Sequence, residues 1–186
     1  MKQLAIFDLD GTLFDTTRVN FLAYQQVLAP RGYHPEFDFF RRECFGHDYG
    51  YFGPLLAPGA SPEELREIHR EKKACYASYL KYAVKNEHLF RLIHLMRSEY
   101  HTALVTAGSR ANSTDILTRF GEQDSFDLYL TAENVTKAKP DPQGFLKAME
   151  YFNVTPEQTI IFEDSPTGIK AAQASGATLF VVEGFN

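Results

Sequence analysis

Two carboxylates one residue apart, Asp8 and Asp10, are the first residues of this chain that could do chemistry. They follow the apolar run 4–7, which is too short for a helix and is bounded by turn residues, so we predict a buried strand. Neighbouring carboxylates at the carboxyl end of such a strand are costly to place together unless a cation neutralises them. The pattern therefore indicates a site where one aspartate attacks, the other moves a proton, and a divalent metal ion holds both.

A second acidic pair, Glu163 and Asp164, ends another predicted buried strand that begins at Thr159. Oxygen ligands of this kind suit a hard cation such as Mg²⁺, which commonly keeps waters beside a few carboxylates and a phosphate. Ser165 followed by Pro166 is typical of a helix start, with the serine as N-cap and the proline in the first turn.

Four segments together resemble the motifs of the haloacid dehalogenase (HAD) superfamily, and they occur in that family's order. They begin at Asp8 and together span nearly the whole chain. The four segments are Asp8-Leu9-Asp10-Gly11-Thr12; Thr106 at the end of the run 102–106, with Ala107-Gly108-Ser109; Lys139-Pro140-Asp141-Pro142 with Phe145; and Glu163-Asp164-Ser165 continuing to Ala172.

The resemblance implies a role for each motif. Asp8 would be the nucleophile that becomes a phospho-aspartate, and Asp10 the general acid and base. Mg²⁺ would bridge the Asp8 carboxylate and the Asp10 backbone carbonyl, with Asp164 as a direct ligand and Glu163 in support. The phosphoryl group would be bound by Asp8, the Thr106 hydroxyl, the Ala107 amide and Lys139, a compact positive charge that offsets the carboxylates.

The elements that must position these residues are easiest to recognise beyond about residue 84, where helical and strand patterns alternate. Such alternation predicts an α/β fold: a Rossmann-like parallel sheet with helices on both faces and right-handed crossovers. The predicted elements are helices over 87–100, up to Gly121, around Phe145 to Met149 and up to Gly176; strands over 102–106, 126–130, 159–163 and 178–182; and a single capped helical turn at 155–158.

Residues 16–83 break this alternation, because they are rich in aromatic residues and have helical periodicity. We therefore predict a core domain over 1–15 and 84–186 and a small α-helical cap domain over 16–83, inserted after the first strand. Such an insertion resembles the capped HAD branch that contains β-phosphoglucomutase and phosphoglycolate phosphatases. A cap of that kind would close over the bound ester and exclude water, with hinges near 15–17 and 83–86.

Within the insertion, the strongest helix start is Ser61-Pro62-Glu63-Glu64, with Ser61 as cap and Glu64 closing a capping box. The helix that follows should present one mostly apolar side, over which Lys72 would extend its stem. That side consists of Leu65, Ile68, Lys72, Cys75, Tyr76 and Tyr79.

These features predict a Mg²⁺-dependent HAD-like phosphoric monoester hydrolase acting on a sugar phosphate, a phosphoglycolate-like ester or a nucleotide. Family members that displace halide lack the second aspartate and the metal, so dehalogenation is disfavoured. A phosphosugar mutase of the β-phosphoglucomutase type is the alternative. It is weakened because Asn20 stands where such members commonly carry a histidine. A binding or regulatory protein without turnover is a third possibility, and the presence of every motif residue disfavours it.

The substrate-specificity candidates lie in the insertion: Arg41, His47 and Tyr49. An arginine would suit a second anion on the substrate. For each of them the plainer interpretation is a surface charge or packing within the cap, and the many Phe and Tyr residues serve either an aromatic leaving group or the cap's own core.

The composition agrees with a small enzyme of 186 residues and formal net charge −5. That balance argues against a nucleic-acid surface, which normally needs a basic patch, and no segment approaches membrane-spanning length. The two cysteines, Cys44 and Cys75, have no metal or redox spacing, and no signal peptide is recognised. We therefore expect a cytoplasmic protein, a monomer or weak homo-oligomer, with a small phosphate ester as its partner.

Overall fold

The computed structural model describes residues 2–184, which form two compact units. Among the described residues, the first, called the core unit here, comprises 2–15 and 85–184, and the second, called the insertion, comprises Thr16–Val84. Each unit has its own buried interior and is described by itself.

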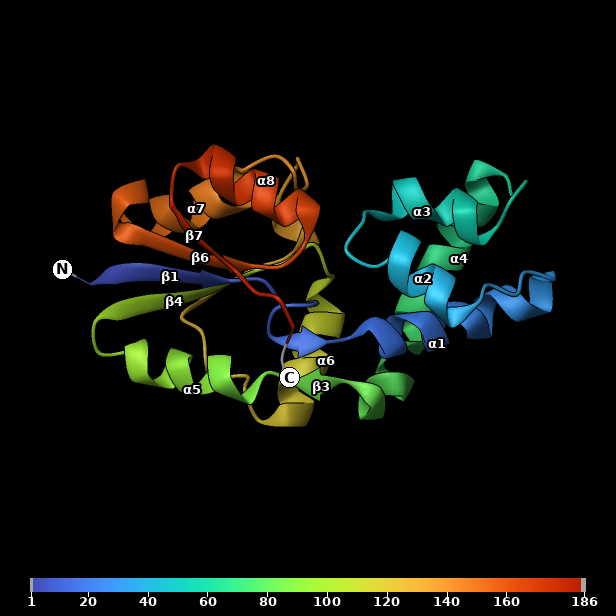
Figure 1. The fold of residues 1–186 in the computed structure, drawn as a ribbon, viewed down its shortest axis with the longest axis horizontal. Helices are drawn as coiled ribbons and strands as arrows, with labels where there is room; N and C mark the ends of the chain where they lie inside the picture. Colours follow the sequence, from blue (N-terminus) through green and yellow to red (C-terminus); the bar gives the residue numbers. More distant parts are fainter. Residues whose placement is uncertain (1, 185–186) are drawn as a thin grey trace. The chain divides into compact units, whose positions relative to one another are not determined.

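The core unit is built on a five-stranded sheet in which every described pairing is parallel. The order β5-β4-β1-β6-β7 places β1 at the centre (Figure 1). A short two-stranded sheet joins β2 and β3. The strands are β1 (Gln3–Phe7), β2 (Phe14–Asp15), β3 (Val84–Lys85), β4 (Tyr100–Val105), β5 (Leu128–Leu130), β6 (Thr159–Glu163) and β7 (Thr178–Val181).

The register of the three central strands brings their carboxyl ends together. Phe7, the last residue of β1, lies beside Leu104 of β4 and Phe162 of β6. Because the strands are parallel, the residues that follow all emerge at the same edge of the sheet. These are Asp8 after β1, Thr106 after β4, and Glu163 and Asp164 at the end of β6.

Helices cover both faces of this sheet, with α7 and α8 on one face and α5 and α6 on the other (Figure 1). The α7/α8 face packs a continuous apolar cluster that includes Ile6, Val105, Phe145 and Ile161. These helices are α5 (Glu87–Met96), α6 (Arg110–Phe120), α7 (Gln143–Phe152) and α8 (Pro166–Ser175), with the short 3₁₀ turns η3 (Ala132–Asn134) and η4 (Pro156–Gln158). The fold class predicted from the sequence is confirmed.

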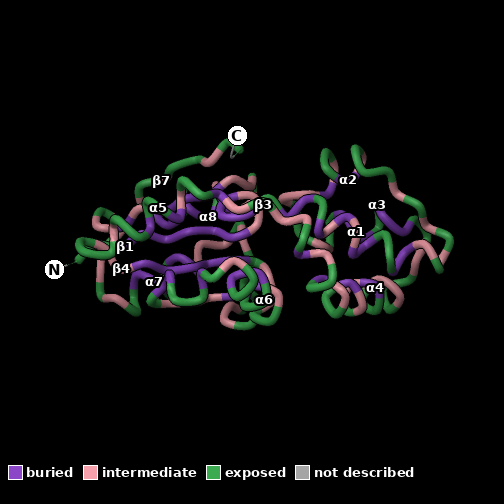
Figure 2. The backbone as a smooth tube through the Cα atoms, turned by 90° about the horizontal axis from the view of Figure 1, so that it is seen from below, coloured by how far each residue is buried: buried purple, intermediate pink, exposed green. Residues whose placement is uncertain are grey.

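The regular elements of the insertion are helical up to Val84, which begins β3, and they pack around aromatic rings. Phe21, Tyr24, Phe40 and Phe52 meet in edge-to-face and tilted contacts, and all four are buried. Such contacts give a small domain both apolar burial and specific geometry. Figure 2 shows buried stretches along the helices of this unit. Its elements are α1 (Thr17–Leu28), η1 (Ala29–Arg31), α2 (Phe37–Glu43), α3 (Tyr49–Leu56), α4 (Pro62–Cys75) and η2 (Tyr76–Tyr82).

The start of α4 follows the predicted capping, since the Ser61 hydroxyl accepts the backbone N–H of Glu64. The predicted helix extends as far as Tyr79, but α4 ends at Cys75 and the chain continues as the tighter 3₁₀ helix η2. A change from 3.6 to 3.0 residues per turn rotates later side chains off the expected stripe. Tyr76 is buried as expected, and Tyr79 is half-buried, with its hydroxyl donating to Gln26.

Candidate active site

A buried cluster of opposite charges occupies the carboxyl edge of the central strands. The Lys139 ammonium donates to Asp8 Oδ1 and to Glu163 Oε1, both at 2.6 Å, and to the Val105 carbonyl at 3.1 Å. The Lys139 side chain is 11% exposed and Glu163 is fully buried. A buried ammonium is stable when it is paired and hydrogen-bonded, as here. Four elements far apart in the sequence are thus joined at one cation.

Burial and pairing act in opposite directions on these groups. Burial raises the pKa of the Asp8 carboxyl well above its ordinary value, and the Lys139 charge opposes that rise. Burial by itself would lower the pKa of Lys139, but the charges of Asp8 and Glu163 outweigh it and the pKa is raised. Lys139 is therefore a permanent positive charge, held against Asp8.

Asp164 stands beside this cluster and is held by the first motif. Thr12 donates its hydroxyl to Asp164 Oδ1 at 2.8 Å. A Cβ at Gly11, where φ is +94°, would lie 2.0 Å from Asp164 Oδ2, so only a glycine leaves room for the carboxylate there. Burial raises the pKa of Asp164 to about 7, against the Thr12 hydrogen bond, which lowers it.

The acidic groups fit a hard cation. Carboxylate oxygens of Asp8, Glu163 and Asp164 lie within 4.8 Å of one another. Glu163 is already committed, because Oε1 accepts from Lys139 and Oε2 accepts the backbone N–H groups of Asp164 and Ser165 and the Ser165 hydroxyl. Asp8 and Asp164 are therefore the better ligands, and Glu163 a support that fixes Lys139.

The end of β4 faces the second aspartate of the first motif. The Thr106 hydroxyl accepts the backbone N–H of Gly108 at 3.0 Å and is buried. A Cβ at Gly108 would lie 3.3 Å from that hydroxyl oxygen and 3.6 Å from an Asp10 carboxylate oxygen. Thr106 and Asp10 thus border the same small space, next to the exposed Ala107.

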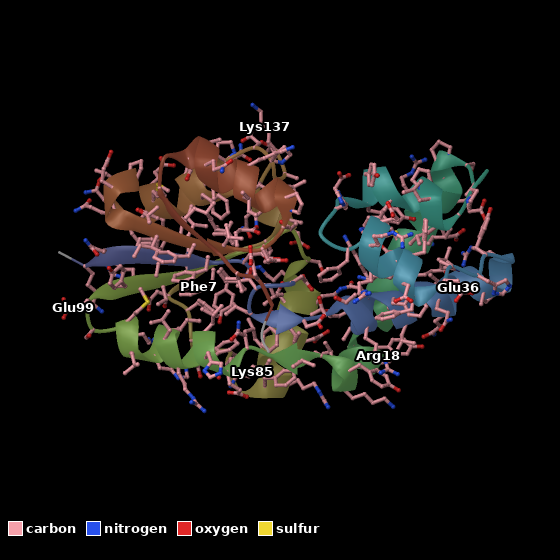
Figure 3. The ribbon with its side chains drawn as sticks, viewed as in Figure 1. Phe7, Arg18, Glu36, Lys85, Glu99 and Lys137 are labelled. Carbon is pink, nitrogen blue, oxygen red and sulfur yellow. The ribbon has the colours of Figure 1, made fainter. Side chains whose placement is uncertain are left out.

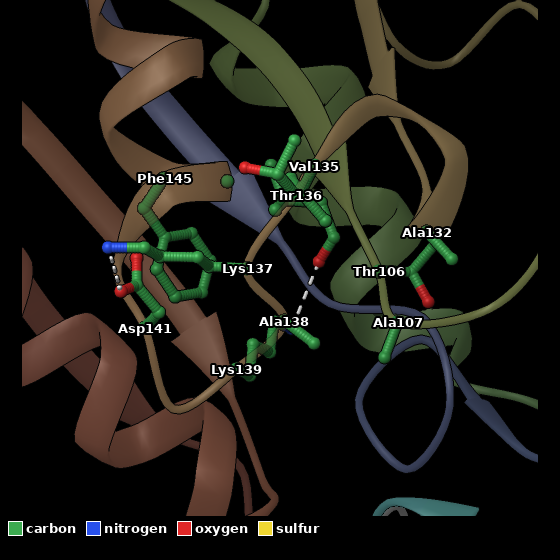
Figure 4. Close-up of a pocket in the computed structure, with 12 residues that line it drawn as sticks. Thr106, Ala107, Ala132, Val135, Thr136, Lys137, Ala138, Lys139, Asp141 and Phe145 are labelled. Carbon is green, nitrogen blue, oxygen red and sulfur yellow. Dashed lines mark hydrogen bonds and ion pairs between the residues drawn. The ribbon is translucent and has the colours of Figure 1, made fainter.

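A pocket of about 160 Å³ opens beside Thr106 and Lys139, between the end of β4, the loop 131–142 and the start of α7 (Figure 4). Val105, Val135 and Phe145 give it apolar walls. Lys137 lies on its rim in an ion pair with Asp141, and extends outward from the loop (Figure 3). The structure therefore places Lys139, and not Lys137, against the acids.

The specificity candidates of the insertion divide into two kinds. Arg41 and His47 lie at its surface, with Arg41 in an exposed ion pair with Asp38 and His47 against the Tyr51 ring. Tyr49 instead stacks on His69, with ring centroids 4.2 Å apart, and donates its hydroxyl to the Leu65 carbonyl. Its hydroxyl is thus engaged inside the insertion, which favours packing as the role of Tyr49.

Two residues that hold the acids in place had no assigned role in the sequence interpretation. Thr12 was only part of the first motif, and Gly168 only part of the fourth. A Cβ at Gly168 would lie 1.6 Å from Glu163 Oε1, so this glycine makes space for the buried glutamate. Ser165 is the N-cap of α8 as predicted, since its hydroxyl accepts the Gly168 N–H. The fixed positions of Thr12 and Gly168 within their motifs were the sequence signal that could have identified these roles.

No helix within residues 2–184 combines the length and the apolar character that crossing a membrane requires.

Comparisons with known proteins agree with this geometry. The family model described as haloacid dehalogenase-like hydrolase matches residues 5–182. A phosphorylated carbohydrates phosphatase of Thermotoga maritima is 29% identical over 94% of this chain and 82% of its own length. A validoxylamine A 7'-phosphate phosphatase of Streptomyces hygroscopicus subsp. limoneus is 32% identical over 95% and 83%.

A solved structure shares the fold over the full length of the chain. CbbY from Rhodobacter sphaeroides in complex with phosphate superposes with a TM-score of 0.82 at 24% identity, covering 100% of this chain and 88% of that one. The family resemblance and the enzyme class predicted from the four motifs are thus confirmed: this chain belongs to the haloacid dehalogenase-like hydrolase family.

Proposed function

We propose that this hydrolase is a Mg²⁺-dependent phosphatase that cleaves a small phosphate monoester through a phospho-aspartate at Asp8. Candidate substrates are sugar phosphates, phosphoglycolate-like esters and nucleotides. The observation that carries the proposal is the buried Lys139 between Asp8 and Glu163, beside Asp164. A permanent cation at that place would offset the negative charge that a transferring phosphoryl group brings in.

The attacking atom follows from the hydrogen bonds. Lys139 holds Asp8 Oδ1, so we assign Oδ2 as the nucleophile. Its attack forms the bond from Asp8 to phosphorus and breaks the bond from phosphorus to the ester oxygen. Asp10 donates a proton to that leaving oxygen, becomes a carboxylate, and then takes a proton from the water that cleaves the aspartyl phosphate.

The positive and hydrogen-bonding groups around Asp8 would hold the transferring phosphoryl oxygens: the Lys139 ammonium, the Thr106 hydroxyl and the Ala107 amide. Asp8, Asp164 and the Asp10 backbone carbonyl would hold Mg²⁺, which supplies further positive charge against the carboxylates and the ester. We propose that the insertion acts as the cap domain and selects the leaving group, with Arg41 and His47 as its exposed candidates.

A hydrolase is favoured over a mutase by the environment of position 20. Asn20 donates its side-chain amide to the Thr16 carbonyl and hydroxyl and accepts a hydrogen bond from Lys72. An amide has no proton that titrates near neutral pH. The structure therefore offers no titrating group at this position to control when Asp10 engages, as the histidine of mutases does.

The test is release of phosphate from a panel of sugar phosphates, nucleotides, phosphoglycolate and an aryl phosphate, with Mg²⁺ and with a chelator. We expect release only with Mg²⁺, and a loss of about 10⁴-fold or more in Asp8→Asn. Mass spectrometry of acid-quenched enzyme should find phosphate on Asp8.

Each other outcome has a distinct meaning. Aspartyl phosphate without phosphate release would favour the mutase. Metal-independent release, or release that survives Asp8→Asn, would exclude the proposed mechanism. If no substrate of the panel gives phosphate release or phosphorylation of Asp8, the proposed phosphatase activity is contradicted for these substrate classes.

A further inference from the structure

The loop that carries Lys139 is tied to the first residue of α7. Gln143 Oε1 accepts the backbone N–H groups of Thr136 at 2.7 Å and Lys137 at 3.0 Å. The side chains of Gln143 and Thr136 are also joined, with Gln143 Nε2 donating to the Thr136 hydroxyl at 3.0 Å. One amide side chain thus replaces water for two consecutive N–H groups of a loop segment that is exposed and lacks regular structure.

The same residue holds the other side of the loop. The backbone N–H of Gln143 donates to Asp141 Oδ1 at 3.0 Å, and the other Asp141 oxygen pairs with the Lys137 ammonium at 3.7 Å (Figure 4). The loop is therefore attached to Gln143 two residues before and two residues after Lys139. This places the backbone of Lys139 between two fixed points.

The point of attachment is rigid because α7 is buried. Gly144 and Phe145, the next residues, are buried, and Phe145 and Met149 belong to the apolar cluster on the sheet. A Cβ at Gly144 would lie 2.9 Å from Val105, so the start of α7 lies directly against the end of β4. Gln143 therefore anchors the loop to a helix that is fixed against the edge of the sheet.

Lys139 needs such a constraint. Its ammonium must satisfy the Asp8 carboxylate, the Glu163 carboxylate and a carbonyl together at the end of a long, flexible side chain. A small shift of its backbone would lengthen one of these contacts, and catalytic groups lose efficiency when they are misplaced by about 1 Å.

We propose that Gln143 is a positioning residue for Lys139, which fixes the loop 136–141 so that the ammonium stays on Asp8. This inference rests on the proposed phosphatase for its kinetic consequence, but its structural consequence can be measured without turnover.

The first test is Gln143→Met, which keeps the size of the side chain and removes its hydrogen bonds. We expect kcat to fall about tenfold while KM changes less than about threefold, because Lys139 acts on the transferring group. Gln143→Glu keeps the acceptor for both N–H groups and should restore kcat to within about threefold of the original.

Gln158→Met is the matched control. Gln158 Oε1 also accepts a loop N–H, that of Thr155 at 3.1 Å, but it lies at the amino end of β6, away from the site. We expect it to change kcat less than about twofold. An equal loss of kcat in Gln158→Met and Gln143→Met would mean a general effect on folding and would overturn the proposal.

The second test asks whether Gln143 acts through Lys139. In a Lys139→Ala background, Gln143→Met should change the rate of aspartyl phosphate formation less than about twofold, because the group that it positions is gone. A tenfold loss in both backgrounds would contradict the proposal.

The third test needs no substrate. Acetylation of Lys139 by acetic anhydride, followed by mass spectrometry, should be at least about fivefold faster in Gln143→Met than in the original chain, Gln143→Glu or Gln158→Met. An unchanged rate would overturn the positioning role whatever the kinetics. If labelling changes as expected but the original chain releases no phosphate, then the proposed function fails and the positioning of Lys139 stands.

Discussion

Each unit of this protein buries a lysine, and the two are stabilised in different ways. Lys139 of the core unit lies between the carboxylates of Asp8 and Glu163. Lys72 of the insertion is 7% exposed, and its ammonium lies over the rings of Tyr24 and Tyr76, 5.1 and 4.8 Å from the centroids. It also donates to the side-chain amide oxygen of Asn20.

The difference follows from what each interior is made of. Acidic residues lie at the strand ends of the core unit, so its buried lysine is paired with opposite charges. Because the pair is buried, water screens this electrostatic attraction less than it would at the surface. The insertion gathers aromatic rings, so its lysine is placed against ring faces, which attract cations more weakly. A buried cation between acids that also fit a metal indicates chemistry, whereas a buried cation over aromatic rings is compatible with packing alone.

The largest expected effect that tests this comparison is that of Lys139→Met. Removing the cation should lower kcat about 10²- to 10³-fold, because the ammonium group that offsets the charge of the phosphoryl group is lost. It should also lower the free energy of unfolding by about 3 kcal/mol, since two buried carboxylates lose their partner. Phosphate release and urea denaturation measure the two effects.

Lys72→Met is the matched change in the insertion. Methionine keeps most of the stem over the rings, so the free energy of unfolding should fall by only about 1 kcal/mol. Equal losses of stability in the two variants would show that the carboxylates contribute no more than the rings, and would break the comparison.

A second comparison is between two glycines, one in each unit. Gly168→Ala in the core unit would place a Cβ 1.6 Å from Glu163 Oε1, so the glutamate must move and Lys139 with it. We expect a loss of about 2–3 kcal/mol in the free energy of unfolding, together with a fall in kcat. Thermal unfolding and steady-state kinetics of the same preparation measure both.

Gly32→Ala is the control in the insertion. Gly32 has a φ of +82° and nothing within 4 Å of a Cβ, so only backbone strain opposes the change. Its cost should be about 1 kcal/mol. If Gly168→Ala costs no more than this, Glu163 is not held as closely as the structure indicates.

A further expected effect, smaller than those of Lys139→Met and Gly168→Ala, concerns pH and the insertion. Burial lowers the pKa of His69 to about 4, with the nearby charges of Lys73 and Lys72 acting in the same direction. Between pH 6.5 and 4 the unfolded chain therefore binds a proton that the folded chain does not, so stability falls as the pH falls through that range.

Allowing for the partial exposure of His69, we expect about 1–2 kcal/mol of stability to be lost between pH 6.5 and 4. His69→Gln should remove most of this dependence, because glutamine does not titrate and can still form a hydrogen bond with the Tyr24 hydroxyl, which lies 3.0 Å from His69 Nδ1. Urea denaturation at pH 7 and pH 4.5 compares the two chains. An unchanged pH dependence in the variant would assign the effect to other groups.

The sequence by itself determined the alternating fold and the identity of the motifs, because both are local patterns. A short apolar run ending in Asp8 and a capped helix beginning after Ser165 depend on neighbouring residues, and they can be recognised without a fold. The same local signals located the helical insertion, since aromatic residues at helical spacing interrupt the alternation.

Tertiary structure alone decided which groups meet. Parallel register brings Asp8 close to Glu163, and the loop before α7 brings Lys139 to both. No local pattern encodes the Lys139 contact that leaves Glu163 fully committed. It also decided that α4 ends at Cys75 and continues as a 3₁₀ helix, because the two helix types differ little in energy and packing selects between them. Gly168 and Gln143 set the geometry of the site through their contacts with Glu163 and with the loop 136–141. These contacts exist only in the folded chain.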